Sequence, residues 1–239
     1  MPIPPTPSLI AHRGGARNAP ENTLAAFRSA ATLGVSWIEC DVTLLRDGSL
    51  VIFHDETVNR CTDGRGRIRD MDRAAVSALD AGNGFGTAFT GERIPSLGQT
   101  LDLCCDLGLA INLELKIHDS EDADLARAVA DHLANAARLP PLLFSSFSLP
   151  ALREFRRLDP QADLGFITSH LPRQWRGIAA DLGLVSLHVN ARFLRRGQIA
   201  ALQNAGYRVF AYTVNEADQA RRLLDWGVDG VFTDCPQDL

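Results

Sequence analysis

The sequence has no run rich in lysine and arginine, and no apolar run near the roughly 18 residues of a membrane span. Acidic side chains outnumber basic ones, 29 to 24, and the net charge is −5. A basic surface for nucleic acid or for an anionic membrane is therefore not expected, and the predicted partner is a small molecule. Residues 1–7 lack both the basic and the apolar region of a signal peptide. We therefore expect a cytoplasmic protein without stable membrane association, as a monomer or a homo-oligomer.

Several common catalytic motifs are also missing. The five cysteines include no C-x-x-C pair for zinc or redox chemistry, and Cys40, Cys104 and Cys105 lie in apolar segments, so we predict reduced, packed thiols. Gly64-x-Gly66 is not followed by the lysine and helix of a phosphate loop, and no G-x-S-x-G turn is present. Nucleoside-triphosphate and serine-acyl chemistry are therefore not supported.

Short apolar segments alternate with helical patterns, which is typical of repeated β-α units around a parallel sheet. Helix signals agree with this pattern, because Asn22 can cap a helix over residues 23–33 and Gly227 follows a helix over residues 216–226. The eight predicted strands are residues 9–12, 37–43, 111–116, 142–146, 163–167, 185–189, 208–213 and 230–233. Single α/β barrels commonly have about 250 residues. We therefore predict one α/β domain over residues 1–239, a (β/α)8 barrel of the TIM type.

One connection, between the second predicted strand and a helix near residues 96–107, exceeds the usual ~2–6 residues. It begins with a predicted hairpin, whose turn is Asp47-Gly48 and whose returning strand ends at His54-Asp55. The remainder is polar and rich in glycine. We predict a small insertion after strand 2, roughly residues 55–95, that forms a lid and not a second domain.

Two predicted strands carry charged side chains on one face and apolar side chains on the other. The second strand places Glu39 and Asp41 together, and the third places Glu114 and Lys116 together. Three carboxylates inside a barrel are costly unless a cation compensates their charge. Because oxygen ligands favour Mg²⁺, Ca²⁺ or Mn²⁺ over Zn²⁺, Glu39, Asp41 and Glu114 are predicted to bind one divalent cation. The alternative is a set of plain salt bridges with Lys116 or Arg13.

A second polar group follows the first predicted strand. There, His12-Arg13-Gly14-Gly15 combines glycines that let a ligand approach the backbone with an arginine suited to phosphate. His54 could face His12 across the barrel mouth as an acid–base partner, or could be a hydrogen-bonded residue at a strand end. The charges of the three carboxylates, of Arg13 and Lys116 and of a divalent ion sum to about one positive charge. This net charge suits a phosphodiester anion. Of the other histidines, His188 alone is placed to reach the mouth.

These residues resemble the glycerophosphodiester phosphodiesterase family, in its bacterial cytoplasmic form. The matching motifs are His12-Arg13-Gly14, Pro20-Glu21-Asn22-Thr23, Glu39-x-Asp41-Val42, His54-Asp55, Glu114-x-Lys116, Tyr212-Thr213-Val214-Asn215 and residues 227–234. They extend over nearly the whole chain. The resemblance implies a TIM-type barrel with a small insertion after strand 2. It also implies hydrolysis of glycerophosphodiesters, such as glycerophosphocholine and glycerophosphoethanolamine, to sn-glycerol 3-phosphate and an alcohol.

The resemblance further implies a role for each site residue. These are catalytic His12 and His54, phosphoryl-binding Arg13 and Lys116, and metal-binding Glu39, Asp41 and Glu114. Tyr212 stands where many relatives carry tryptophan and would line the glycerol pocket. We hypothesise that the glycerol 2-hydroxyl attacks phosphorus while a histidine protonates the departing alcohol, and that water then opens the cyclic phosphate. Direct attack by water is the rival route.

Three other functions would use part of the same pattern. A metal-dependent barrel aldolase or isomerase would explain the carboxylates but not the paired histidines. A lysophospholipase D-like or phospholipase C-like enzyme would need an apolar entrance, for which residues 83–89 offer only Phe85 and Phe89. A non-catalytic protein that binds phosphodiesters would be expected to lack at least one histidine or ligand, and all of these positions are occupied.

Overall fold

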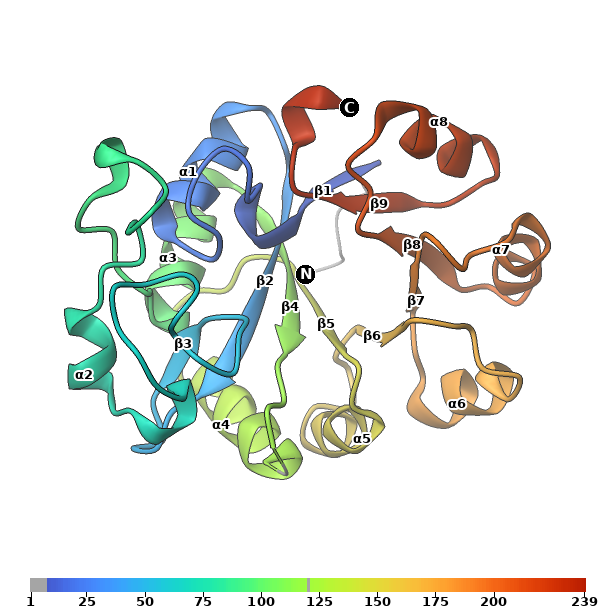
Figure 1. The fold of residues 1–239 in the computed structure, drawn as a ribbon. Helices are drawn as coiled ribbons and strands as arrows, with labels where there is room; N and C mark the ends of the chain where they lie inside the picture. Colours follow the sequence, from blue (N-terminus) through green and yellow to red (C-terminus); the bar gives the residue numbers. More distant parts are fainter. Residues whose placement is uncertain (1–7, 120) are drawn as a thin grey trace.

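The computed structural model describes residues 8–119 and 121–239 and shows a closed (β/α)8 barrel of the TIM type (Figure 1). The parallel strands are β1 (Leu9–Ala11), β2 (Trp37–Leu44), β4 (Ala110–Leu115), β5 (Leu142–Ser146), β6 (Leu164–Thr168), β7 (Ser186–Asn190), β8 (Arg208–Tyr212) and β9 (Gly230–Thr233). The sheet closes because β1 pairs with both β9 and β2. The predicted fold class is confirmed, and all eight predicted strands are present. Residues 1–7, on which the expectation about targeting rests, lie outside the described residues.

Helices cover the outside of the barrel, one after almost every strand (Figure 1). They are α1 (Leu24–Thr32), α3 (Leu97–Leu107), α4 (Asp122–Ala134), α5 (Leu149–Leu158), α6 (Trp175–Leu182), α7 (Arg196–Gln203) and α8 (Ala217–Asp225). Serine side chains cap two of them, Ser96 on α3 and Ser148 on α5. Among the described residues, every helix is too short or too polar to cross a membrane.

The predicted cap of α1 is wrong by one residue. Thr23, in an extended conformation, is the N-cap, and its hydroxyl accepts a hydrogen bond from the Ala26 N–H at 3.2 Å. Asn22 has a φ of +57°, a left-handed conformation in which it cannot serve as the extended cap residue. Its amide points instead to Asp41 inside the barrel and donates to Oδ2 at 2.8 Å.

The hydrophobic core has an outer and an inner part, as strand alternation requires. Ile38, Cys40 and Val42 of β2 point outward and pack in the layer between the sheet and the helices. The inward-facing side chains at the bottom of the barrel form a separate cluster of Ile10, Trp37, Ala110, Leu143, Phe210 and Phe232. This cluster closes the barrel below the polar side chains. The cysteines are free thiols, and of the three predicted to pack only Cys105 is not fully buried.

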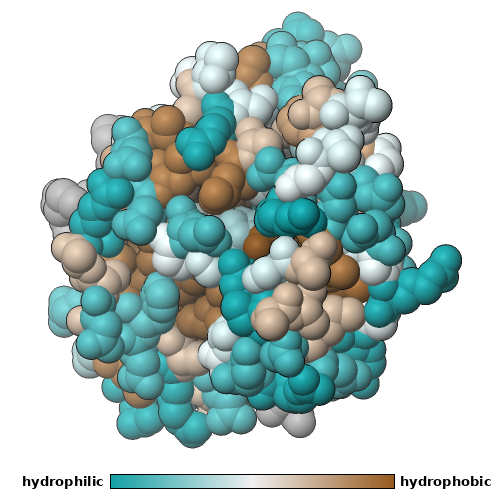
Figure 2. Space-filling model, turned by 90° about the vertical axis from the view of Figure 1, so that its left-hand side faces the viewer, coloured by the Kyte–Doolittle hydropathy of each residue, from teal (hydrophilic) through white to brown (hydrophobic). Residues whose placement is uncertain are grey.

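The insertion is more ordered than its polar composition predicts. Before it, β3 (Leu50–Ile52) pairs antiparallel with β2 through a turn in which Gly48 has a φ of +84°. The insertion then contains α2 (Arg73–Ala78) and two short 3-10 helices, η2 (Ile68–Asp70) and η3 (Thr87–Phe89). It packs with the preceding hairpin around a separate core, made of Leu45, Val51 and Phe53 of the hairpin and Val58, Ile68, Val76, Ala81 and Ile94 of the insertion. On this side of the molecule, hydrophobic atoms are interspersed among hydrophilic side chains (Figure 2).

The turn after β1 is a 3-10 helix, η1 (His12–Gly14), and its glycine serves the packing of a helix. A Cβ added at Gly14 would lie 2.7 Å from Ala26 Cβ and 2.8 Å from Phe27 Cδ1 of α1, and φ at Gly14 is +84°. The sequence suggested that this glycine lets a ligand approach the backbone. The structure shows that it lets helix α1 approach, and this holds the preceding His12 and Arg13 at the barrel mouth.

We expect Gly14→Ala to destabilise the protein by about 1–2 kcal/mol for the left-handed backbone and by a further 1–3 kcal/mol for the clash with α1. Gly48→Ala is the matched control, because Gly48 has the same φ of +84° but nothing within 4 Å of an added Cβ. It should show the backbone cost alone. Urea unfolding of both variants measures the difference, and equal losses would contradict the packing role of Gly14.

Candidate active site

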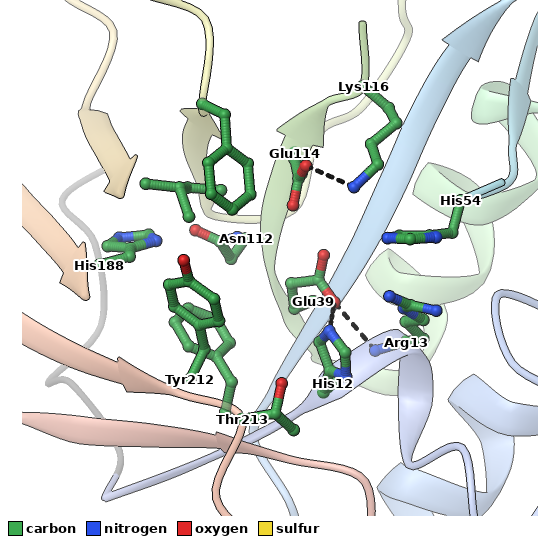
Figure 3. Close-up of a pocket in the computed structure, with 13 residues that line it drawn as sticks. His12, Arg13, Glu39, His54, Asn112, Glu114, Lys116, His188, Tyr212 and Thr213 are labelled. Carbon is green, nitrogen blue, oxygen red and sulfur yellow. Dashed lines mark hydrogen bonds and ion pairs between the residues drawn. The ribbon is translucent and has the colours of Figure 1, made fainter. Parts of the chain in front are cut away.

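One cavity at the carboxyl ends of the strands brings most of the predicted site residues together (Figure 3). Its lining residues are His12, Arg13, Glu39, His54, Asn112, Glu114, Lys116, Phe147, Ile167, His188, Tyr212, Thr213 and Phe232. Asp41, the one predicted site residue absent from this lining, is fully buried beside Glu39 and Glu114. The charged side chains occupy one half of the cavity, and His188 and Tyr212 lie across from them (Figure 3).

The three carboxylates meet because of the register between two neighbouring strands. Asp41 of β2 is the direct partner of Glu114 on β4, and Glu39 is two residues before Asp41 on the same face. One oxygen from each carboxylate lies within 4.8 Å of the others. All three side chains are buried. This is the cluster that the alternation of the two strands predicted.

Positive charges beside the cluster balance part of its charge. The Lys116 Nζ donates to Glu114 Oε1 at 2.8 Å and lies 3.4 Å from Asp41 Oδ1, while the Arg13 Nε lies 3.6 Å from Asp41 Oδ2. Burial opposes ionisation of Asp41, but its neighbours, Lys116 first, hold its pKa below the ordinary value. The alternative of plain salt bridges therefore accounts for Asp41.

Salt bridges do not account for the other two carboxylates. Burial, and next the charge of Asp41, raise the pKa of Glu39 well above its ordinary value and the pKa of Glu114 to about 7. Glu39 Oε1 is moreover a buried oxygen that accepts no hydrogen bond within the described part of the chain. Unsatisfied buried oxygens that repel one another are what a divalent cation compensates. The residues therefore fit such an ion, and hard oxygen donors suit Mg²⁺, Ca²⁺ or Mn²⁺.

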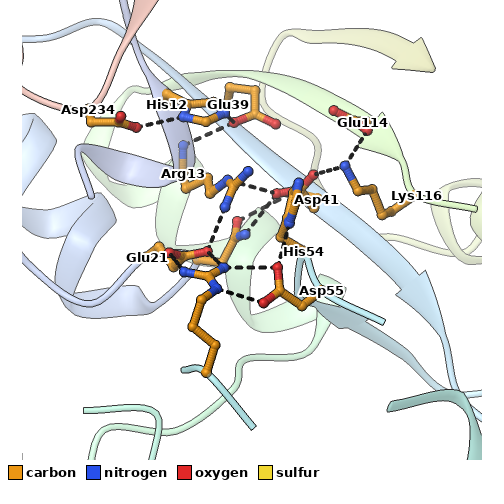
Figure 4. A network of polar contacts seen from close by, with 12 residues as sticks. His12, Arg13, Glu21, Glu39, Asp41, His54, Asp55, Glu114, Lys116 and Asp234 are labelled. Carbon is orange, nitrogen blue, oxygen red and sulfur yellow. Dashed lines mark hydrogen bonds and ion pairs between the residues drawn. The ribbon is translucent and has the colours of Figure 1, made fainter. Parts of the chain in front are cut away.

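His12 and His54 are each held by an aspartate through Nδ1. His12 Nδ1 lies 2.7 Å from Asp234 Oδ1, and His54 Nδ1 lies 2.7 Å from Asp55 Oδ1 (Figure 4). Asp234 is held in turn by the side-chain amide of Asn215, which donates to Oδ2 at 2.7 Å. Such bonds fix the ring orientation and leave Nε2 for substrate. The sequence motifs contain both aspartates, but only the fold shows which histidine each one contacts.

The backbone of Arg13 ties the turn after β1 to the carboxylate cluster. Arg13 has a φ of +53°, which is uncommon for a residue with a side chain, and its N–H donates to Glu39 Oε2 at 2.9 Å. Its carbonyl accepts from the N–H of Asn22, whose side chain donates to Asp41. The Arg13 guanidinium is held by Glu21 at 2.7 Å. Motif residues 20–23 thus position groups of the cavity as well as starting helix α1.

His188 reaches the cavity, as the sequence predicted, but it is not placed to exchange protons at neutral pH. Its side chain is 1% exposed, and its Nε2 lies 2.9 Å from Ser186 Oγ. Burial lowers its pKa to about 3, so the ring is neutral. Gly165 makes this arrangement fit, since an added Cβ would lie 2.6 Å from His188 Nε2. Sequence reasoning missed Phe147, Ile167, Thr213 and Phe232 as cavity residues, because barrel closure brings them together.

The model of the glycerophosphoryl diester phosphodiesterase family matches residues 12–238. The chain belongs to this family. It is therefore a hydrolase, and a glycerophosphodiester phosphodiesterase from Caldanaerobacter subterraneus is 34% identical to it over 97% of this chain and 95% of that protein. A phosphodiesterase structure from Oleispira antarctica, in complex with the product sn-glycerol 3-phosphate, has a TM-score of 0.94 and 37% identity, covering 97% of this chain and 94% of that chain. A structure from Silicibacter pomeroyi, described as a glycerophosphoryl diester phosphodiesterase, has a TM-score of 0.86 and 28% identity, over 98% of this chain and 92% of that chain.

The acidic cluster predicts an unusual response to neutralising Glu39. In metal-stripped protein, Glu39→Gln should raise the Tm by about 2–8 °C, because one source of buried repulsion is removed. Added Mg²⁺ or Ca²⁺ should raise the Tm of the wild type but not of Glu39→Gln. Glu154→Gln, on helix α5 away from the cavity, should keep the response to metal. A Glu39→Gln variant that is less stable without metal and still stabilised by it would contradict the assignment.

Proposed function

We propose that the protein hydrolyses glycerophosphodiesters, such as glycerophosphocholine and glycerophosphoethanolamine, to sn-glycerol 3-phosphate and an alcohol. The observation that carries the proposal is that two histidines, each held by an aspartate at 2.7 Å, share one cavity with cationic side chains and an acidic cluster. Two positioned imidazoles supply the base and the acid of a phosphoryl transfer. The product complex of the similar Oleispira antarctica enzyme supports this substrate class.

Binding of the phosphodiester rests on the charged half of the cavity. Arg13 and Lys116 both keep their charge at neutral pH, since the surrounding carboxylates raise the pKa of each although burial opposes it. Their positive charge suits the phosphoryl oxygens. Glu39, Asp41 and Glu114 would hold the divalent cation, which when bound acts as a Lewis acid toward a phosphoryl oxygen. We expect Mg²⁺ or Ca²⁺, and Mn²⁺ has the same ligand preference.

The histidines move the protons of the reaction. Burial lowers the pKa of His54, so its neutral, proton-accepting form is favoured when the cavity is empty. One histidine accepts the proton of the attacking hydroxyl, and the other donates a proton to the oxygen of the departing alcohol. The aspartates keep both rings in orientation during this exchange. The Tyr212 ring lies at the other half of the cavity, where it would contact the glycerol moiety (Figure 3).

A lipid substrate is less well supported by the residues around the mouth. Phe85 is 38% exposed and packs edge-on against Phe89, but it lines a separate hollow beside Glu21 and not the cavity. Phe147 is the one exposed large apolar side chain among the described residues that line the cavity. A single phenylalanine offers little surface to an acyl chain.

A cytoplasmic location and homo-oligomerisation stay predictions.

The proposal is tested by release of sn-glycerol 3-phosphate from glycerophosphocholine, with metal-stripped protein before and after addition of Mg²⁺ or Ca²⁺. We expect release only after the ion is added. His12→Ala and His54→Ala should each lower kcat by about 10²–10⁴-fold while the rise in Tm with metal is kept. Inactivity of the wild type with a demonstrably bound ion would contradict the proposal and favour a lipid diester or aldolase chemistry.

The order of bond formation is tested with a substrate that lacks the attacking hydroxyl. If the glycerol 2-hydroxyl attacks phosphorus and a cyclic phosphate forms, the 2-deoxy analogue of glycerophosphocholine should bind but turn over at least about 10²-fold more slowly. Competition with glycerophosphocholine measures its binding, and choline release measures turnover. Turnover of the analogue at the ordinary rate would establish direct attack by water.

A further inference from the structure

Arg60, in the loop of the insertion that follows Asp55, makes two paired contacts with partly buried carboxylates. Its terminal nitrogens donate to the two oxygens of Glu21 at 2.6 and 2.8 Å. Its Nε and one terminal nitrogen donate to the two oxygens of Asp55 at 2.7 and 2.9 Å. One guanidinium group thus binds two carboxylates, each through both oxygens, which is the planar recognition that arginine alone provides.

The two carboxylates bound by Arg60 each hold a residue of the cavity. Glu21 Oε1 accepts from the Arg13 guanidinium at 2.7 Å, and Asp55 Oδ1 lies 2.7 Å from His54 Nδ1. Glu21 belongs to the segment before α1, whereas Asp55 follows strand β3, so the two carboxylates come from separate parts of the chain. Figure 4 shows Glu21 next to Arg13 and Asp55 next to His54, with both pairs beside Asp41. Within the described part of the chain, the Arg60 side chain contacts both carboxylates.

Exposure of Arg60 does not make these contacts equivalent to an ordinary surface ion pair. The Arg60 side chain is 52% exposed, but Glu21 and Asp55 are only 16% and 23% exposed. Exposed ion pairs contribute little because long side chains lose freedom and salt screens them. Here each carboxylate also bonds a cavity residue, Arg13 or His54, and the guanidinium fixes the orientation of both carboxylates. The contacts therefore act on geometry more than on stability.

We propose that Arg60 is a positioning residue, which holds His54 and Arg13 in register with each other through Asp55 and Glu21. The inference rests on the proposed function, because His54 and Arg13 matter to catalysis only if the cavity cleaves a phosphodiester. Arg60 itself does not line the cavity. It links the insertion, a segment outside the repeated β-α pattern, to both the proton-transfer group and the phosphate-binding group.

The kinetic expectation follows from what Arg60 holds. Without it, Asp55 and Glu21 can each rotate with the residue that they bind, and a displacement of about 1 Å can cost up to 10²-fold in rate. Arg60→Gln should therefore lower kcat by about 10- to 100-fold and raise KM for glycerophosphocholine, since Arg13 loses its fixed position. Arg60→Lys should be intermediate, because an ammonium group cannot bind both carboxylates through paired contacts.

Arg67→Gln is the matched control on the same insertion. Arg67 is 40% exposed and pairs with Asp119 at 2.6 Å and Glu56 at 3.1 Å. These contacts do not include Glu21 or Asp55. It should leave kcat and KM unchanged. All variants are assayed with Mg²⁺ or Ca²⁺ present, and their Tm is measured so that any loss of folded protein is counted. If Arg60 were only structural, its loss would lower Tm and the amount of active protein, but KM would not change.

A double-mutant cycle with Asp55→Asn decides whether Arg60 acts through the aspartate. The fold-loss of kcat caused by Arg60→Gln should be at least about tenfold smaller in the Asp55→Asn background than in the wild type. The reason is that the contact of Arg60 with Asp55 is already disabled in that background. Equal losses in both backgrounds, or unchanged kcat and KM in Arg60→Gln, would overturn the positioning role. No release of sn-glycerol 3-phosphate by the wild type would overturn the proposed function, and the positioning role with it.

Discussion

The mutual repulsion of three buried carboxylates is the constraint on which the rest of the active site depends. Glu39, Asp41 and Glu114 cannot all ionise in a closed barrel without compensation. The chain supplies compensation only in part, through Lys116 and through Arg13, whose N–H and guanidinium lie beside two of the carboxylates. The negative charge that remains uncompensated favours binding of a divalent cation. With that cation bound, the site favours an anionic substrate. The same electrostatic imbalance thus supports both the proposed metal site and the proposed phosphodiester substrate.

The fold makes this imbalance tolerable by confining it to one level of the barrel. Below the carboxylates the inward side chains are apolar and close the floor, and outside them the helices exclude water from the sheet. A buried charge in such surroundings is felt strongly by its neighbours. Residues at the mouth are therefore held by direct hydrogen bonds, and the left-handed backbone of Arg13 and of Asn22 occurs where those bonds require it.

Patterns that recur along the chain could be predicted from the sequence, and contacts between distant segments could not. The alternation in two strands was enough to place Glu39, Asp41 and Glu114 on one inner face. His12 and Asp234, by contrast, are separated by 222 positions and meet only because β1 pairs with β9. The insertion was also underestimated, because its small core combines residues of the preceding hairpin with single apolar residues scattered through a polar segment. The role of Asn22 was mistaken because a local cap and a long-range bond to Asp41 use the same amide.

His12 and His54 are held in similar ways by parts of the protein with different origins. The partner of His12 comes from the end of the last barrel strand, so its orientation depends on closure of the sheet. The partner of His54 is the adjacent Asp55, whose position depends on the insertion and on a guanidinium that also reaches the segment before α1. Sequence changes in the insertion can therefore alter the orientation of His54 without disturbing that of His12. Most site residues of this barrel thus lie on its strands or directly after them, whereas the orientation of His54 depends on a loop of the insertion.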